Sequence, residues 1–549
     1  MKGVRRALAL AAAVAAGAGA AADPAPLVLD GVVPEDASRF FELPFEVPAG
    51  IEEIEVRHGD LSATNVLDWG LFDPERFRGW GGGNEEPAVV GVRAASRSYL
   101  PGPLPPGTWR VSVGKAKVSE LPARYHVEIL LRQTATLAPQ ANRRPYAPAA
   151  PLSRGSRWYA GDFHVHSRES GDARPTLDEI ASYARGTAGL DFAVITDHNT
   201  VSHLDFVVDA QARHLDFLFV PGLEITTYWG HANAYGMTRW VDFRLDASAP
   251  SIQAAVDQVR ASGALFAINH PVQDLGDLCI GCSWSLTVPA TGVDGLEVAN
   301  AGYRQMGALF NDPSLAFWDS LATRGIKAAA VGGSDDHRAG REDTPYQSPI
   351  GQPTTLVWAD ELSAAAIVDG VARGHTVVKA QGVGDPMVEL RAGSALGGDT
   401  VVSTQPLALI ATVTGGRGYQ VRFVHDGAPL PPVTIDADPF TAELEVTPPE
   451  QCEDRFRAEV LVDGRPRTIT NHLWVARAAG TGCANGASPP PASLSGDGCA
   501  CGAASAPAGT ALVMAAALAA LLRARAVRAS RRRAAPASAA GTTARWRPW

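Results

Sequence analysis

Nine histidine and acidic residues occur in short strings, each of which follows an expected strand of this chain. They are His164, His166, Asp172, His198, Glu224, His231, His270, Asp335 and His337. His164 and His166 lie two positions apart, as Asp335 and His337 do, so in an extended segment both side chains of a pair project to one face. Because a buried imidazole or carboxylate without a partner is costly, so many at the ends of successive strands favour a site for divalent cations. Mixed imidazole and carboxylate ligands suit zinc, manganese or iron and need no thiolate.

Expected strands and helices alternate between residues 156 and 384, the segment that carries all nine residues. The strands are expected to end at His164, Thr196, Val220, Ile268, Glu297, Gly332 and Lys379. Three helices have recognisable ends: one from the capping box Thr176-Leu-Asp-Glu179 to Gly189, one from Ser251 to Gly263, and one from Ser363 to Gly374. Seven strands in this alternation predict a parallel barrel of the α/β class, with the nine residues at the strand ends where barrel enzymes place their chemistry. No glycine-rich phosphate-binding string follows the first strand, which argues against a dinucleotide-binding fold.

The expected barrel is flanked by two regions of short strands in which apolar and polar residues alternate. In residues 23–137 such strands are expected at 40–47, 51–56, 108–113 and 125–131. In residues 385–477 they are expected at 407–413, 419–424 and 458–462. Each region is predicted to be a β-sandwich. The Pro/Ala/Arg-rich residues 138–155 are expected to be a linker.

Both ends of the chain carry targeting signals. Residues 1–22 combine a basic start, a short apolar run and small residues before Asp23, which predicts a signal peptide and an exported protein. A low-complexity linker with a Cys motif at residues 478–502, an apolar stretch at 503–522 and a basic tail at 523–549 predict one transmembrane segment. The Gly-Cys-x-Cys-Gly string, the span and the arginine run resemble the myxobacterial C-terminal sorting tail. The alternatives are a simple tail anchor and a disordered, alanine-rich end. The expected location is the cell surface or periplasm, with membrane contact through the C-terminal segment.

Charge and cysteine content limit the partners and the metal chemistry. The formal net charge is -10, so a long nucleic-acid groove is not expected. In an exported chain the six cysteines can be oxidised. Cys279 and Cys282 could form a tight local disulfide, and Cys452 could pair with Cys483. A zinc ribbon would need a second closely spaced pair at the right distance, which the chain lacks.

Five strings resemble the motifs of the polymerase-and-histidinol-phosphatase (PHP) metallohydrolases. They are Gly-Asp-Phe-His164-Val-His166-Ser, Ile-Thr-Asp-His198-Asn, Gly-Leu-Glu224, Asn-His270-Pro and Gly-Ser-Asp335-Asp-His337. The string Ser170-Gly-Asp172 and the flanking β-regions resemble the CehA/McbA, or carbaryl-hydrolase-like, branch. The resemblance covers roughly residues 156–384. It implies a distorted seven-stranded (βα) TIM-like barrel that holds two or three divalent metal ions.

The same resemblance implies which residues share a cation. His164, His166, Glu224 and Asp335 would bind one metal, which Glu224 would bridge to a second held by His231 and His270. Asp172, His198 and His337 would hold a third, although some members of the family have a histidine in place of Asp172. Two adjacent cations lower the pKa of a bridging water enough to give hydroxide near neutral pH. The expected reaction is therefore phosphoester hydrolysis, with Glu224, Asp335, His337 and Arg338 as the catalytic residues.

Other residues near these strings have alternative roles. Asp162 and Asp197 could orient ligand histidines or make loop hydrogen bonds, and Glu297 and Asn300 are expected to support the structure or the ligands. Arg168, Arg304, Arg338 and Arg341 could bind an anion, and Arg338 is the first choice among them. Tyr228, Trp229 and Tyr303 could line a pocket or pack structurally. His203, His214 and His375 are placed outside the site.

Three functions remain open from the sequence. The first is a phosphoesterase for a small phosphate ester or nucleotide, which includes exonuclease-like activity. The second is an ester or carbamate hydrolase of the carbaryl-hydrolase type. The third is a non-catalytic surface module that binds through its β-regions. The expected substrate is a small, anionic molecule, and the sequence does not determine the oligomeric state.

Overall fold

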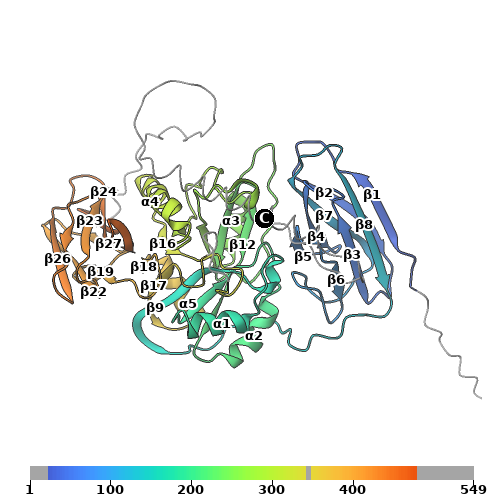
Figure 1. The fold of residues 1–549 in the computed structure, drawn as a ribbon, viewed down its shortest axis with the longest axis horizontal. Helices are drawn as coiled ribbons and strands as arrows, with labels where there is room; N and C mark the ends of the chain where they lie inside the picture. Colours follow the sequence, from blue (N-terminus) through green and yellow to red (C-terminus); the bar gives the residue numbers. More distant parts are fainter. Residues whose placement is uncertain (1–22, 342–347, 479–549) are drawn as a thin grey trace, which may run out of the picture. The chain divides into compact units, whose positions relative to one another are not determined.

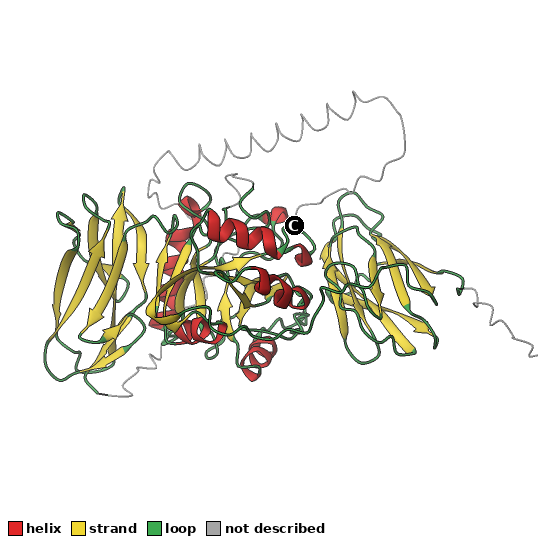
Figure 2. Ribbon diagram, turned by 90° about the horizontal axis from the view of Figure 1, so that it is seen from below, coloured by secondary structure: helices red, strands yellow, loops and turns green. Residues whose placement is uncertain are grey.

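The computed structural model describes residues 23–341 and 348–478 (Figure 1). It is a mixed α/β structure with many strands and few helices (Figure 2). The expected signal peptide, the C-terminal Cys motif, transmembrane segment and basic tail, and Cys483 all lie outside the described residues. Among the helices of the described residues, none has the length and apolar character to cross a membrane.

The N-terminal region is a β-sandwich, as its alternating strands predict. One sheet has the order β1 (Leu27–Val32), β8 (Arg124–Arg132), β3 (Glu53–Gly59) and β6 (Ala88–Gly91). The other has the order β2 (Phe40–Val47), β7 (Gly107–Lys117), β4 (Val66–Phe72) and β5 (Phe77–Gly82). Inward residues of both sheets, such as Ile54 and Trp109, form one apolar core. Every strand pairing in these two sheets is antiparallel, and most neighbouring strands, such as β1 and β8, are not consecutive in the chain.

The central region contains two mixed sheets with helices around them (Figure 2). The first sheet includes β11 (Leu218–Pro221), β10 (Phe192–Ile195), β9 (Arg154–Val165), β17 (Thr354–Glu361) and β18 (Thr376–Lys379). The second has the order β12 (Glu224–Thr227), β13 (Gly230–Tyr235), β14 (Leu265–Ile268), β15 (Gly295–Ala299) and β16 (Ala329–Gly332). Single β-bridges, Val165 to Asp336 and His198 to Glu224, connect residues across the two sheets.

This arrangement corrects the expected parallel barrel. All seven predicted strands are present, and their ends lie within two residues of the predicted positions. However, β17 runs antiparallel to both β9 and β18, and β12 and β13 form an antiparallel hairpin. Only two residues link β12 to β13, which is too short for a parallel crossover. The described residues therefore form two joined mixed sheets, and one continuous parallel barrel is not observed in them.

Five α-helices lie in the central region: α1 (Leu177–Gly186), α2 (Leu204–Arg213), α3 (Gln253–Ala261), α4 (Gly307–Thr323) and α5 (Ala364–Ala372). The capping box of Thr176 and Glu179 is present at α1, and Ser363 caps α5. At α3 the hydroxyl of Ser251 accepts from the backbone N–H of Gln253 at 3.4 Å, although the residue directly before the helix is Ile252, which forms no side-chain cap. The helices end two or three residues before the predicted glycines, which follow in left-handed turns that favour glycine.

The C-terminal β-region shares a sheet with the central region. Its outer sheet contains β20 (Ala395–Leu396), β19 (Met387–Ala392), β22 (Leu407–Thr414) and β26 (Phe440–Val446). The facing strands are β23 (Gln420–His425), β27 (Glu453–Val462), β28 (Arg465–Thr470) and β29 (Leu473–Ala476), with the short β21 (Thr400–Val402), β24 (Ala428–Pro429) and β25 (Val433–Thr434) at their margins. Strand β28 pairs with β18, so the first sheet of the central region continues into this sandwich. The two regions are thus joined by backbone hydrogen bonds.

An ion-pair cluster also joins α4 to the C-terminal sandwich. Asp319 Oδ1 lies 2.7 Å from Arg457 Nη1 and 3.4 Å from His472 Nε2. Burial by itself raises the pKa of Asp319, but His472 and Arg457 outweigh it and lower the pKa to about 2. The ionised carboxylate of Asp319 therefore stabilises the fold at pH values above the pKa that Asp319 has in the unfolded chain. This stabilisation is lost as the pH falls toward the pKa of Asp319 in the folded protein.

We expect Asp319→Asn to lower the free energy of unfolding by about 2 kcal/mol near neutral pH. The reason is that Arg457 and His472 would no longer have a carboxylate as their partner. Urea denaturation at several pH values measures this effect. The difference between the variant and the wild type should narrow between pH ~4 and ~2. A difference that does not change with pH would contradict the ion-pair explanation.

Candidate metal centre

The nine predicted residues converge in space around Glu224, which is fully buried. Its Oε1 lies 3.4 Å from His164 Nε2 and 3.3 Å from His231 Nδ1, and its Oε2 lies 2.6 Å from His198 Nδ1. His270 Nε2 is 3.7 Å from the same carboxylate. With His166 Nε2, which lies 3.5 Å from Oε2, a single acidic side chain thus contacts five imidazoles that come from four separate segments.

The other two acids extend this cluster to either side of Glu224. Asp335 Oδ1 lies 3.3 Å from His164 Nε2 and 3.0 Å from His166 Nε2. Asp172 Oδ2 lies 3.4 Å from His198 Nε2 and 3.2 Å from His337 Nε2. The rings of His166 and His337 are stacked, with centroids 4.2 Å apart. We call the nine residues together the central cluster.

The elements that position the cluster differ from the prediction at one point. His164 lies in β9, and His198, His270 and Asp335 follow β10, β14 and β16, as expected. Glu224 and His231 were expected to follow a strand, but Glu224 begins β12 and His231 lies in β13. In this hairpin His231 is paired with Thr226, two residues after Glu224, so the strand period brings both side chains to one face.

Two cluster residues have a backbone conformation that is unusual for residues other than glycine. The φ angle is +25° at His270 and +57° at Asp335. Such left-handed conformations cost on the order of 1–3 kcal/mol and persist only where the surrounding structure imposes them. Soon after a strand ends, the turn directs His270 toward Glu224, and Asp335 toward His164 and His166.

Contacts on the outer side of the imidazoles determine which nitrogen faces the cluster. His164 Nδ1 lies 2.7 Å from Glu297 Oε1, and His270 Nδ1 donates to a backbone carbonyl at 3.0 Å. His337 Nδ1 donates to the carbonyl of Asp335 at 2.8 Å. Because a carbonyl only accepts, the proton lies on Nδ1 of His270 and His337, and their Nε2 atoms are free to bind a cation.

The donor set fits divalent cations. His164 Nε2, His270 Nε2 and Asp172 Oδ1 are buried and form no hydrogen bond with any described residue. Three groups of cluster residues each have their possible ligand atoms within 4.8 Å of one another: His164, His166 and Asp335; His164, Glu224 and His270; and His166, His198 and His337. Buried polar atoms without partners are rare in folded proteins, and a cation would satisfy them.

Within the cluster, acids and imidazoles shift one another's protonation. Burial raises the pKa of Asp172, Glu224 and Asp335, but the neighbouring imidazoles outweigh it and hold each pKa well below its usual value. Burial lowers the pKa of His166 to about 4, helped by His337 and His198. The acids therefore stay ionised and available as ligands, and a bound cation would replace protons on the imidazoles.

The sequence left two possible roles open for the acidic residues near the cluster, and the structure shows which contacts each of them makes. Glu297, besides its contact with His164, accepts hydrogen bonds from the backbone N–H of His270 at 3.0 Å and from Asn300 Nδ2 at 3.0 Å. Asp162 and Asp197 make loop hydrogen bonds and do not orient imidazole rings of the cluster. Asp162 accepts from the backbone of His164, Ser334 and Gly351, and Asp197 accepts from the backbone and hydroxyl of Ser167.

The sequence analysis missed three residues that contact the cluster. Asn269 Nδ2 donates to Glu224 Oε1 at 2.9 Å, Thr226 Oγ1 lies 2.6 Å from His198 Nδ1, and Ser170 Oγ lies 3.1 Å from His166 Nδ1. Each is one to four residues from a cluster member in the sequence. That proximity is the only signal that could have indicated Asn269 and Thr226, because their partners belong to other segments, whereas Ser170 contacts His166 of its own segment.

The predicted arginines and aromatic residues have varied surroundings. Arg341 pairs with Glu179, and Arg168 approaches Glu169 while its side chain is 57% exposed. Arg338 is anchored by its backbone N–H, which donates to Asp336. The hydroxyl of Tyr228 donates to Asp68 of the N-terminal sandwich at 2.7 Å, and that of Tyr303 donates to Asp312 at 3.0 Å. The contacts of Tyr228 and Tyr303 are therefore structural.

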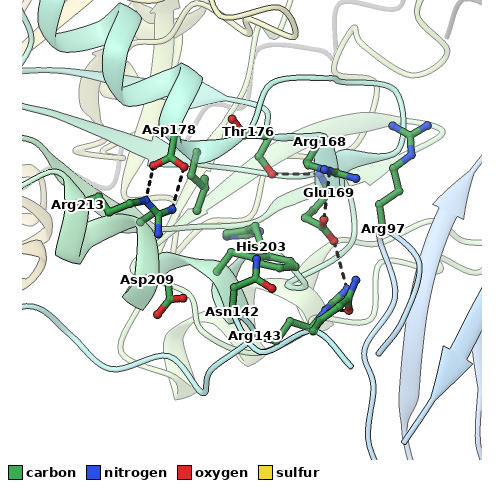
Figure 3. Close-up of a pocket in the computed structure, with 15 residues that line it drawn as sticks. Arg97, Asn142, Arg143, Arg168, Glu169, Thr176, Asp178, His203, Asp209 and Arg213 are labelled. Carbon is green, nitrogen blue, oxygen red and sulfur yellow. Dashed lines mark hydrogen bonds and ion pairs between the residues drawn. The ribbon is translucent and has the colours of Figure 1, made fainter. Parts of the chain in front are cut away.

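A cavity of about 210 Å³ lies next to the η1 turn (Arg168–Ser170) and is lined by none of the nine cluster residues (Figure 3). Ion pairs of Asp178 with Arg213 and of Glu169 with Arg143 lie along it. His203, predicted to lie outside the site, is fully buried here, and its Nδ1 is 3.2 Å from Asp197 Oδ2. The central cluster, with its possible metal ligands, therefore lies outside the lining of this cavity.

The chain matches no protein-family model and no curated protein. Among solved structures, it is similar to a two-domain protein from Bacteroides vulgatus that contains a predicted PHP-like metal-dependent phosphoesterase, with 18% identity over 60% of this chain and 99% of that one (TM-score 0.33). It is similar to a protein from Bifidobacterium adolescentis described as a metal-dependent phosphoesterase, with 15% identity over 36% of this chain and 94% of that one (TM-score 0.25). It is also similar to the CARDB domain of a Pyrococcus furiosus protein, with 18% identity over 17% of this chain and 96% of that one (TM-score 0.14).

Proposed function

We propose that this protein is a metal-dependent hydrolase and that the central cluster is its active site. The observation that carries the proposal is the convergence of six imidazoles and three carboxylates, several of whose inward atoms are buried without a hydrogen bond. A purely structural role would leave these atoms unsatisfied at considerable cost. Resemblance of the five sequence strings to the PHP metallohydrolases supports the same assignment.

The cluster residues divide into three neighbouring sets that could each hold a cation. His164, His166, Glu224 and Asp335 form one set, and His231 and His270 form a second that shares Glu224. Asp172, His198 and His337 form the third. Divalent cations held there would acidify a bound water and polarise the bond to be hydrolysed. Glu297 and the backbone carbonyls behind the imidazoles would keep the ligand nitrogens directed inward.

We favour a phosphoester, such as a small phosphate ester or a nucleotide, as the substrate. Several cations in a shared site suit the charge of a phosphoryl group, and Arg338, next to His337, is our first choice for an additional anion contact. The second candidate is hydrolysis of a carboxylic ester or carbamate, which the Ser170-Gly-Asp172 string and the flanking β-sandwiches favour by resemblance. The third is a non-catalytic binding module, against which the intact donor set argues.

A substrate panel with metal analysis tests these three functions. The purified protein would be loaded with zinc, manganese or iron, and turnover of p-nitrophenyl phosphate, a p-nitrophenyl phosphodiester, a carboxylic ester and a carbamate would be compared. Turnover of the phosphate compounds only is the expected result. Turnover of the ester or carbamate only would support the second candidate. Absence of both metal and turnover would overturn the proposal.

Removal of the cations is expected to abolish hydrolysis and to lower the Tm. Only the folded protein brings the cluster residues together. A cation at a concentration a thousandfold above its Kd would therefore stabilise the folded state by about 4 kcal/mol. Activity and thermal unfolding would be measured before and after treatment with a chelator, and again after zinc, manganese or iron is restored. An unchanged Tm and undiminished activity in the metal-free protein would contradict metal dependence.

We also propose that the protein is exported and that its C-terminal segment contacts the membrane. Residues 1–22 and 503–549 support this by their composition. N-terminal sequencing of the protein from its native host should begin at Asp23, and membrane fractions should retain it unless the tail is removed. A mature protein that begins at Met1 and occurs only in the soluble cytoplasmic fraction would contradict the proposal.

A further inference from the structure

A disulfide lies in a loop whose backbone carbonyls contact two histidines of the central cluster. Cys279 and Cys282, three residues apart, form this disulfide. Between them, the carbonyl oxygen of Ile280 lies 3.3 Å from His231 Nε2. The carbonyl oxygen of Cys282 accepts from His270 Nδ1 at 3.0 Å. The small covalent ring closed by the disulfide therefore contains the carbonyl group of Ile280, and the carbonyl group of Cys282 is attached directly to it.

The sulfur of Cys282 lies at the edge of the central cluster itself. The possible ligand atoms of His231, His270 and Cys282 all lie within 4.8 Å of one another. Cys282 is 2% exposed, and His270 Nε2 is buried and forms no hydrogen bond with any described residue. While it is bonded to Cys279, the sulfur carries no charge and is a poor ligand. As a thiolate it would be a strong ligand for zinc and similar cations.

We propose that the Cys279–Cys282 disulfide is a redox switch of the metal ligands. In the oxidised form His231 and His270 bind the cation without sulfur, together with Glu224. In the reduced form the Cys282 thiolate joins the two imidazoles as a further ligand. This inference rests on the proposed function, because it requires a cation at this end of the central cluster.

The switch needs a reductant, and a dithiol supplies the required chemistry. One dithiol thiolate attacks the disulfide, and its second thiol completes the exchange. Overall, two electrons and two protons pass to the Cys279–Cys282 bond, which becomes two thiols, and the reductant becomes a disulfide. On binding the cation, the Cys282 thiol releases its proton to solvent.

A solvent-accessible approach to the disulfide exists. A cavity of about 330 Å³ is lined by both cysteines, by Ile280 and by residues of the same loop. Lys117 of the N-terminal sandwich, which pairs with Asp277 of the loop at 2.6 Å, also lines it. A small dithiol can therefore reach Cys279, the less buried of the two cysteines, without opening the sheets.

The extra ligand should change both affinity and turnover. Catalytic zinc sites keep one coordination position for water or substrate, whereas sites with four protein ligands are closed. A thiolate from Cys282 would take up such a position. We therefore expect the reduced protein to bind zinc more tightly and to hydrolyse its substrate more slowly than the oxidised protein.

Cobalt(II) titration of the full chain tests the switch, because cobalt bound to a thiolate gives a sulfur-to-metal charge-transfer band in the near ultraviolet. Four samples would be compared without oxygen: oxidised wild type, wild type reduced with a phosphine, Cys279→Ser and Cys282→Ser. Cys279→Ser leaves the Cys282 thiol without its disulfide partner, and Cys282→Ser removes it. The band is expected in the reduced wild type and in Cys279→Ser, and it should be absent in the oxidised wild type and in reduced Cys282→Ser.

The outcomes separate this inference from the proposed function. If the oxidised wild type binds no cobalt, the proposed metal centre itself is wrong. If it binds cobalt but neither the reduced wild type nor Cys279→Ser shows the band, only the switch is overturned. A band that persists in reduced Cys282→Ser would assign the thiolate to another cysteine and would also overturn the switch. Should Cys279→Ser fail to fold, the reduced wild type still decides the question.

Discussion

Glu224→Gln is expected to reduce hydrolysis by about 10³-fold, which corresponds to roughly 4 kcal/mol of lost transition-state stabilisation. Glu224 is fully buried and contacts His164, His198 and His231 at 2.6 to 3.4 Å. Glutamine has nearly the same shape, but it lacks the negative charge and replaces one acceptor oxygen with a donor. Two of the three proposed cation sets include this carboxylate, so the variant should lose affinity at both.

Metal content and turnover measured on the same sample check this prediction. Mass-spectrometric metal analysis should show less than the wild-type amount of bound cation, and excess metal should not restore the rate. Glu443→Gln provides a matched control, because Glu443 is exposed on β26 and far in sequence from the central cluster. The control should keep both metal and activity. Wild-type turnover in Glu224→Gln would refute the placement of the active site.

Glu297→Gln should weaken cation binding by about 10- to 100-fold, the range found when a residue that orients a metal-bound histidine is changed. Glu297 Oε1 lies 2.7 Å from His164 Nδ1, while Oε2 accepts from the backbone of His270 and from Asn300. It thus supports two imidazoles from different sheets, one in β9 and one after β14, without itself reaching the proposed cations. A neutral amide would hold the His164 ring less firmly and would make its Nε2 a weaker ligand.

The response to added metal distinguishes Glu297 from Glu224. In Glu297→Gln, a titration with zinc or manganese should shift to higher concentration, and turnover should recover largely at saturating metal. In Glu224→Gln it should not recover. Urea denaturation of the metal-free Glu297→Gln protein serves as the control, since a merely structural role would lower its stability without changing the metal titration. An unchanged metal affinity would contradict a positioning role for Glu297.

Local signals in the sequence were sufficient for the ends of strands and for two helix caps. Apolar runs predicted where β9, β14 and β16 end, and the residues after them, such as His270 and Asp335, were correctly selected as cluster members. The capping box at Thr176 and the cap at Ser363 were also correct, because a cap depends on contacts within four residues. Residue types alone therefore indicated which side chains could meet.

Strand direction and partners of the side chains were decided only by the folded structure. Apolar periodicity is the same for parallel and antiparallel strands, so it could not show that β17 is antiparallel or that Glu224 and His231 lie on a hairpin. Nor could it show that Asn269 and Thr226 contact the cluster, or that Cys282 lies beside His231 and His270. These contacts join segments that are distant in the chain, and only the packing of the two sheets determines which of them meet.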